Sequence, residues 1–212
     1  MNMKATVAAA ALLAGSTFGV SAATFNVLPG TASGSNDFQA SIETFFGGAG
    51  NVAFATLVGV TVAEDELLTF ILAGAESGNT NTFTAEFLEG TATLTESNNG
   101  LNPSPATLGN FASISGTFAA GALNAGDLSF DGSGDSVNAS FGHPAMGVYY
   151  NPSISGDQRF LIAYDDNATD DNHDDMIIEA FGTVTPVPLP AAGWMLLAGL
   201  TGMAALRRRK KS

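Results

Sequence analysis

Short runs of apolar and β-branched residues, separated by clusters of Gly, Asn, Asp and Ser, recur through most of this sequence. Within the runs, apolar residues tend to alternate with polar ones, as in strands that bury one face. No interior stretch keeps the 3.6-residue period of an amphipathic helix for about 12 residues. The pattern predicts an all-β fold, a single antiparallel β-sandwich of jelly-roll type, with one short helix at residues 37–46. The expected strands are residues 51–62, 67–72, 82–95 with a bend at Gly90, 111–118, 128–130, 137–141, 148–150, 159–164 and 176–184.

The charged residues are distributed very unevenly along the chain. Its 212 residues include 7 basic and 20 acidic ones, a net charge of −13. All the acidic residues lie between Asp37 and Glu179. Between Lys4 and Arg207, by contrast, Arg159 is the only basic residue. Such a body repels phosphate backbones and attracts cations, which excludes nucleic-acid binding. Cysteine is absent, which excludes disulfides, thiolate zinc sites and a cysteine nucleophile.

The N-terminus has the three parts of a secretory signal peptide. Lys4 provides the positive start, residues 5–15 form a short apolar run, and the small residues Ala22 and Ala23 lie at a cleavage site. Cleavage is expected after Ala22 or Ala23, so that residues 1–23 form the signal peptide. The remaining body, residues 24–185, is expected to be exported and to fold as a single domain.

The C-terminus, residues 186–212, also has three parts in a fixed order. A proline-rich stretch is followed by 16 uncharged residues, 191–206, and then by a basic tail. A helix over residues 189–206 would be about 27 Å long, close to the ~30 Å thickness of the hydrocarbon core. Because basic residues stay on the cytoplasmic side, we expect a transmembrane helix with the body outside. The residues of this membrane stop are Arg207, Arg208, Arg209, Lys210 and Lys211.

The proline-rich motif consists of Val187, Pro188, Leu189, Pro190 and Ala191. Together with the apolar helix and the basic tail, it resembles the PEP-CTERM sorting signal of Gram-negative bacteria, in its VPLPA variant. Leu189 stands where the main family has Glu. The resemblance covers residues 186–212 and implies recognition by an exosortase-like membrane protease. It also implies an inner-membrane-anchored precursor that is later moved to the cell surface or to an exopolysaccharide-bearing matrix.

An acidic segment, residues 165–175, lies between two expected strands and holds six Asp residues. Crowded carboxylates repel one another, and an oxygen-rich set of this kind suits Ca²⁺. The segment contains a D-x-[DN]-x-[DN] pattern, but the EF-hand positions for Gly and Glu hold Asp175 and Phe181. It also resembles an acidic strand–loop–strand motif of secreted bacterial β proteins. The expected calcium ligands are Asp165, Asp166, Asp170, Asn172, Asp174 and Asp175.

Two alternatives to a calcium site stay open for this segment. The first is a solvated acidic turn without any ion, in which water and spacing relieve the repulsion. The second is a transition-metal site with His173 as a ligand. His143, which precedes Pro144, is expected only to form a turn.

No nucleophile elbow, zinc-protease motif, Walker loop or dinucleotide fingerprint occurs in the sequence. We therefore expect a protein that is not an enzyme, with a structural or adhesive role in an exopolysaccharide or biofilm matrix. One alternative is a carbohydrate-binding module that exposes Tyr149 and Tyr150 on one face. The other is a secreted polysaccharide hydrolase that uses a pair of carboxylates.

Overall fold

The computed structural model describes residues 23–30, 36–76, 79–97, 107–133, 136–167 and 172–186. Over these residues the chain is almost entirely β-structure, and its strands pair mostly antiparallel, as the sequence predicted. Apart from Ala23 and Pro186, the expected signal peptide and sorting signal lie outside the described residues. No helix within the described part is long and apolar enough to cross a membrane.

The larger sheet is built from eight strands. Its main path runs in the order β1 (Ala23–Pro29), β2 (Ala53–Val62), β9 (Met146–Tyr150), β10 (Asp157–Tyr164), β11 (Met176–Pro186), β3 (Glu66–Gly74) and β6 (Ala112–Phe118), and β7 (Gly121–Ala122) pairs with β2. β1 also pairs in parallel with the second half of β11, from Thr24 opposite Thr183 to Val27 opposite Pro186. Because β1 pairs with both β2 and β11, the strands β1, β2, β9, β10 and β11 form a closed ring.

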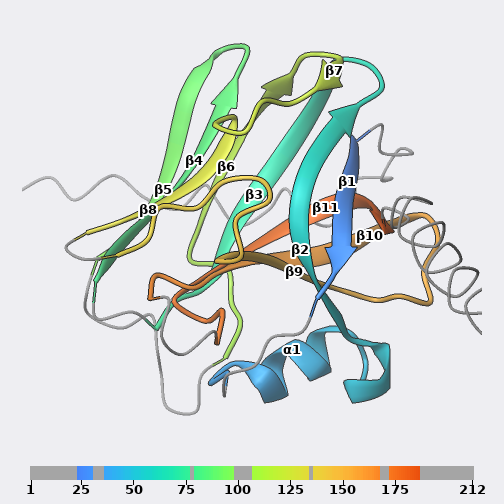
Figure 1. Ribbon diagram of the computed structural model, residues 1–212, viewed down its shortest axis with the longest axis vertical. Helices are drawn as coiled ribbons and strands as arrows, with labels where there is room; N and C mark the ends of the chain where they lie inside the picture. Colours follow the sequence, from blue (N-terminus) through green and yellow to red (C-terminus); the bar gives the residue numbers. More distant parts are fainter. Residues whose placement is uncertain are drawn as a thin grey trace, which may run out of the picture.

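The smaller sheet has the order β5 (Gly90–Ser97), β4 (Thr80–Phe87) and β8 (Leu128–Gly132). It lies beside β3 and β6 (Figure 1). Phenylalanine rings from the two sheets pack against each other, with 5.1 Å between the centroids of Phe70 and Phe83 and 4.9 Å between those of Phe87 and Phe118. Burial of these large rings supplies much of the apolar free energy that holds the sheets together.

The expected short helix is confirmed as α1 (Gln39–Phe45), which is followed by the 3-10 turn η1 (Ala49–Asn51). α1 lies across one end of the larger sheet (Figure 1). Phe38 and Ile42 are fully buried there, in a second apolar cluster with residues of β9, β10 and β11. This cluster packs α1 against strands β9, β10 and β11.

Two expected strands differ from the observed ones. Residues 82–95 form a hairpin of two strands, because the chain turns after Phe87 and Gly90 adopts a φ of 122°, which favours glycine. Residues 137–141 form no strand but only one bridge, between Ala139 and Phe130. The sequence analysis did not predict β1 and β7, which obtain their partners from distant segments of the chain.

Candidate metal centre

Three carboxylates from distant parts of the sequence meet at the end of the larger sheet that carries α1. Asp37 precedes α1, Glu76 follows β3, and Asp174 precedes β11. Their ligand oxygens all lie within 4.8 Å of one another. β3 and β11 are antiparallel neighbours, so the end of β3 comes next to the start of β11. The acidic group of Asp37, Glu76 and Asp174 is therefore a product of strand pairing.

Asn36 holds two of these segments together. Its amide nitrogen donates to the carbonyl oxygens of Asn172 at 2.9 Å and His173 at 3.2 Å, and to the hydroxyl of Tyr149 at 3.1 Å. Its amide oxygen accepts the backbone N–H of Phe38 at 2.8 Å. These bonds fix the chain on both sides of Asp37 and just before Asp174, and so help to position these two carboxylates.

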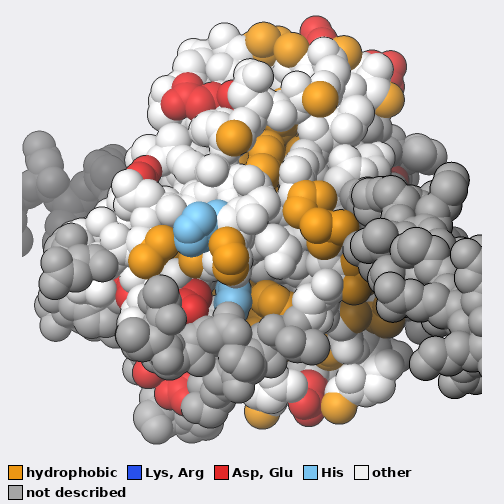
Figure 2. Space-filling view, viewed as in Figure 1, with side chains coloured by type: hydrophobic (Ala, Val, Ile, Leu, Met, Phe, Trp, Pro, Cys, Tyr) orange, Lys and Arg blue, Asp and Glu red, His pale blue; other side chains and the backbone are white. Residues whose placement is uncertain are grey.

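The electrostatics of this group favour a positive charge. Burial, followed by the charges of Asp174 and Asp37, raises the pKa of Glu76 from 4.5 to about 7. The one basic side chain of the body, Arg159, is already paired with Glu179 at 2.5 Å. On the face of the molecule drawn in Figure 2, acidic side chains are scattered among the described residues and no Lys or Arg is visible. The crowding of these carboxylates therefore favours the binding of a proton or a cation at this group.

His173 has a structural role at this site. Its ring is buried and lies 4.7 Å from the ring of Phe54, and its Nε2 lies 2.9 Å from the carbonyl oxygen of Pro144. Its φ of 55° is in the left-handed region, which turns the chain sharply just before Asp174. The Nε2 atom is thus engaged with the backbone, and the alternative of a transition-metal site with His173 as a ligand stays a prediction.

A second polar group lies nearby, between the two sheets. The Oδ2 atom of Asp166 accepts the amides of Asn79 at 3.2 Å and Asn81 at 2.9 Å. The backbone N–H of Asp166 donates to Asp175 at 2.8 Å, and burial raises the pKa of Asp175 from 3.8 to about 7. Burial also raises the pKa of Tyr164, whose hydroxyl donates to the carbonyl of Val137.

The structure thus divides the six expected calcium ligands instead of gathering them at one point. Asp174 joins the three-carboxylate group, whereas Asp166 and Asp175 belong to the second group. The side chain of Asp165 accepts the N–H of Asn167 at 2.9 Å, and Asn172 bonds to Asn36 through its backbone carbonyl. Asp170 lies outside the described residues.

The sequence analysis did not identify Asp37 and Glu76 as candidate ligands. Both are isolated acids, and the only local pattern around Glu76 was a turn of Glu, Ser, Gly and Asn. Glu76 reaches Asp174 only because β3 pairs with β11. A short stretch of sequence contains no pattern that reveals such a meeting. Only the excess of acids over bases indicated that such groups would form.

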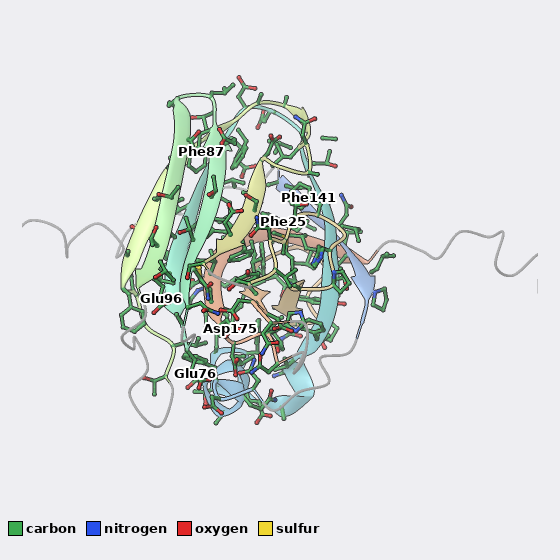
Figure 3. The ribbon with its side chains drawn as sticks, turned by 60° about the vertical axis from the view of Figure 1, so that its left-hand side comes forward. Phe25, Glu76, Phe87, Glu96, Phe141 and Asp175 are labelled. Carbon is green, nitrogen blue, oxygen red and sulfur yellow. The ribbon has the colours of Figure 1, made fainter. Side chains whose placement is uncertain are left out.

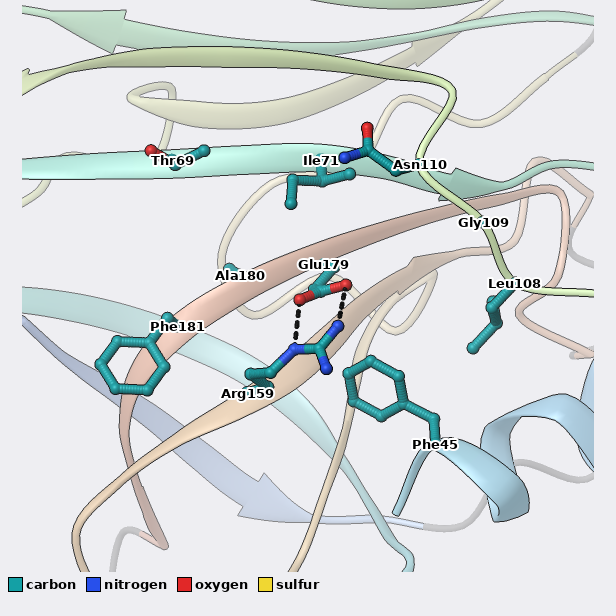
Figure 4. A pocket seen from close by; sticks show the side chains of 10 residues that line it. All are labelled: Phe45, Thr69, Ile71, Leu108, Gly109, Asn110, Arg159, Glu179, Ala180 and Phe181. Atoms are coloured by element: carbon teal, nitrogen blue, oxygen red, sulfur yellow. Dashed lines mark hydrogen bonds and ion pairs between the residues drawn. The ribbon is translucent and has the colours of Figure 1, made fainter. Parts of the chain in front are cut away.

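An open groove of about 630 Å³ lies on another part of the surface (Figure 4). Arg159 and Glu179 form a two-point ion pair across its floor, and the guanidinium lies 4.6 Å from the ring centroid of Phe45. Phe181 lines the same groove. The proposed carbohydrate platform of Tyr149 and Tyr150 is wrong, because these residues are only 4% and 7% exposed.

Comparison with protein-family models, with curated proteins and with solved structures found no match to this chain.

Proposed function

We propose that this protein is an exported structural or adhesive protein of a bacterial cell surface and that Ca²⁺ stabilises its β-sandwich. The observation that carries the proposal is the group of Asp37, Glu76 and Asp174, whose ligand oxygens lie within 4.8 Å of one another. Carboxylate oxygens are the preferred ligands of Ca²⁺, whose remaining positions take backbone carbonyls and water.

A bound ion would act as a structural cross-link. It would join the start of α1, the end of β3 and the start of β11, segments that are otherwise far apart in the chain. Such an ion binds the folded state and not the unfolded chain, so it raises the free energy of unfolding. An exported protein meets Ca²⁺ outside the cytoplasm, where this stabilisation serves a surface role.

The sandwich itself is part of the proposal. Its support is the ring packing between the smaller sheet and strands β3, β6 and β10, including the stacked pair of Phe130 and Tyr164 at 4.8 Å. A layer of rings between two sheets is the core arrangement of a sandwich. The parallel pairing of β1 with β11 adds a closure that a simple two-sheet sandwich lacks.

Export and sorting rest on the two ends of the sequence. We propose that the leader is removed and that residues 186–212 act as an exosortase-like sorting signal with a membrane helix. The described strands extend from Ala23 to Pro186, so the two segments flank the β body and do not interrupt it. The intact mass of the protein from its own cells tests this part. A mass that retains Trp194 and the basic tail would overturn processing at the motif.

Thermal unfolding of the full chain, purified in detergent, tests the calcium part. At a Ca²⁺ concentration of about 100 times Kd, one site adds about 2.7 kcal/mol, or roughly 5–10 °C in Tm for a domain of this size. We expect Glu76→Gln to lower this increment, because it removes a charged ligand but keeps the shape. Glu86→Gln, an exposed carboxylate on β4, is the control and should keep the increment. An identical Tm for the parent in EGTA and in Ca²⁺ would overturn the proposal.

The groove supports a second candidate function, binding of an exopolysaccharide. A sugar in the groove can contact the rings of Phe45 and Phe181 while its hydroxyls bond to the two-point pair of Arg159 and Glu179. The only acid that lines the groove, within the described residues, is this paired Glu179, which favours binding over hydrolysis. A glycan array with the parent and Phe45→Ala tests this function. Binding that Phe45→Ala leaves unchanged would place the ligand elsewhere.

A further inference from the structure

We propose that Asn81, Glu96 and Asp166, with Asn79 beside them, form a second cation site between the two sheets that takes Ca²⁺. Asn81 on β4 and Glu96 on β5 are direct cross-strand partners and lie on the inner face of the smaller sheet. Asp166 approaches them from the connection between β10 and β11. Figure 3 shows Glu96 and Asp175 at the same end of the molecule as Glu76.

Two buried oxygen atoms at this place lack a hydrogen-bond partner among the described residues. They are Oδ1 of Asn81, whose residue is 0% exposed, and Oε2 of Glu96, whose residue is 3% exposed. A buried acceptor without a donor loses its bonds to water and destabilises the fold by about 1–3 kcal/mol. Both atoms are acceptors, so what is missing is a donor or a cation.

The charges at the site match a divalent ion. Glu96 and Asp166 provide two negative charges, and both residues are only 3% exposed. Arg159, the one Arg or Lys among the described residues, is paired with Glu179. Asn79 and Asn81 add neutral amide groups. Two carboxylates and two amide oxygens form a ligand set that suits Ca²⁺ better than Mg²⁺, which keeps most of its water.

The two amides share one acceptor on Asp166. Asn79 and Asn81 both direct their amide nitrogens at the same oxygen, Oδ2 of Asp166, at 3.2 Å and 2.9 Å. An amide presents either its nitrogen or its oxygen after a half-turn about one bond. In its present orientation Oδ1 of Asn81 points toward Gly132 and has no partner within the described part of the chain. With an ion beside Asp166, the half-turn would bring the oxygens of both amides to the cation and leave the carboxylate of Asp166 as a ligand.

A proton on Glu96 is the competing explanation. Burial, followed by the charge of Asp166, raises the pKa of Glu96, so a protonated carboxyl would also relieve the repulsion. A protonated Glu96 binds no calcium, however, and its replacement by glutamine costs little at any Ca²⁺ concentration. The two explanations therefore differ in calcium stoichiometry.

This inference deepens the calcium stabilisation proposed above but rests on different residues, so each site can fail alone. Equilibrium dialysis of the full chain in detergent measures bound Ca²⁺ per chain. We expect Glu96→Gln and Glu76→Gln each to remove one class of bound ion and the double variant to remove both. The control Glu86→Gln, on the outer face of β4, should bind as the parent does.

Unchanged stoichiometry and affinity in Glu96→Gln, with normal circular dichroism, would overturn the second site and leave the first one intact. Should Glu96→Gln fail to fold, Asn81→Asp provides the independent test. It adds a charged ligand in place of a neutral one, so we expect Ca²⁺ to bind at least about tenfold more tightly and the Tm in EGTA to fall. Equal or weaker binding by Asn81→Asp would overturn the proposal as well.

Discussion

The backbone N–H of Asp37 donates to the Oδ2 atom of Asp174 at 2.8 Å. This bond joins a residue just ahead of α1 to a residue just ahead of β11, although 137 positions separate them. It also places the carboxylate of Asp174 against a backbone dipole, where its negative charge is favoured. The start of α1 and the candidate calcium group are therefore one structural unit, and a change in either should alter the other.

Asn36→Ala tests this unit. Loss of the four hydrogen bonds of the Asn36 side chain should lower the free energy of unfolding by about 2 kcal/mol and weaken Ca²⁺ binding, since Asp37 loses its anchor. Urea unfolding and calcium titration measure the two effects. Asn26→Ala is the matched control, because the Asn26 amide makes an exposed 3.4 Å contact with Thr61. Equal effects of the two substitutions would contradict the role of Asn36.

The stability of the calcium-free protein should fall as pH rises. Glu76 and Asp175 have folded-state pKa values of about 7, against 4.5 and 3.8 for the ordinary groups. An acid with a raised pKa binds its proton more tightly in the folded state, so stability is lost from the unfolded pKa up through the folded one. We therefore expect the urea midpoint in EGTA to decline between about pH 4 and pH 7.

The double variant Glu76→Gln, Asp175→Asn provides the control for this pH effect. Neither new amide titrates, so the decline in EGTA should be shallower than in the parent. Saturating Ca²⁺ should also reduce the decline in the parent, because the ion binds the charged form of Glu76. A decline of the same size in parent and double variant would mean that other groups cause it.

Gly147→Ala should destabilise the fold beside His173, near the acidic group of Asp37, Glu76 and Asp174. A Cβ at Gly147 would lie 2.1 Å from Cζ of Phe54, whose ring packs on His173 and Tyr149. The ring must move, which we expect to cost about 1–3 kcal/mol in unfolding free energy. At Gly59, also in a strand, a Cβ meets nothing within 4 Å. Gly59→Ala should thus be neutral or slightly stabilising, and equal losses at both sites would refute the steric argument.

The mature chain should begin at Ala23 instead of Thr24. Ala23 is fully buried and pairs with Val62, as the first residue of the strand that lies between β2 and β11. Cleavage after Ala22 keeps this pair, whereas cleavage after Ala23 removes it and puts a charged terminus on Thr24. The mass of the mature protein from its own cells distinguishes the two, and an N-terminus at Thr24 would contradict this prediction.

Local patterns sufficed for the strands in the middle of the chain. The alternation around Val58 and Val60 predicted β2, and the runs at residues 159–164 and 176–184 predicted β10 and β11 almost to their ends. These signals work because a half-buried strand must alternate apolar and polar side chains. Residues 137–141 carried the same signal and form only one bridge, because a strand also needs a long partner beside it.

Residue types and their order were enough to establish an all-β body with a large excess of carboxylates and a single basic side chain, Arg159. They also marked the acidic segment 165–175 as the place of strongest repulsion. Which carboxylates meet was decided by strand pairing: β3 beside β11 brings Glu76 to Asp174, and β4 beside β5 brings Asn81 to Glu96. Repulsion between charges depends on distance in space, and sequence separation carries no information about that distance until the sheets have formed.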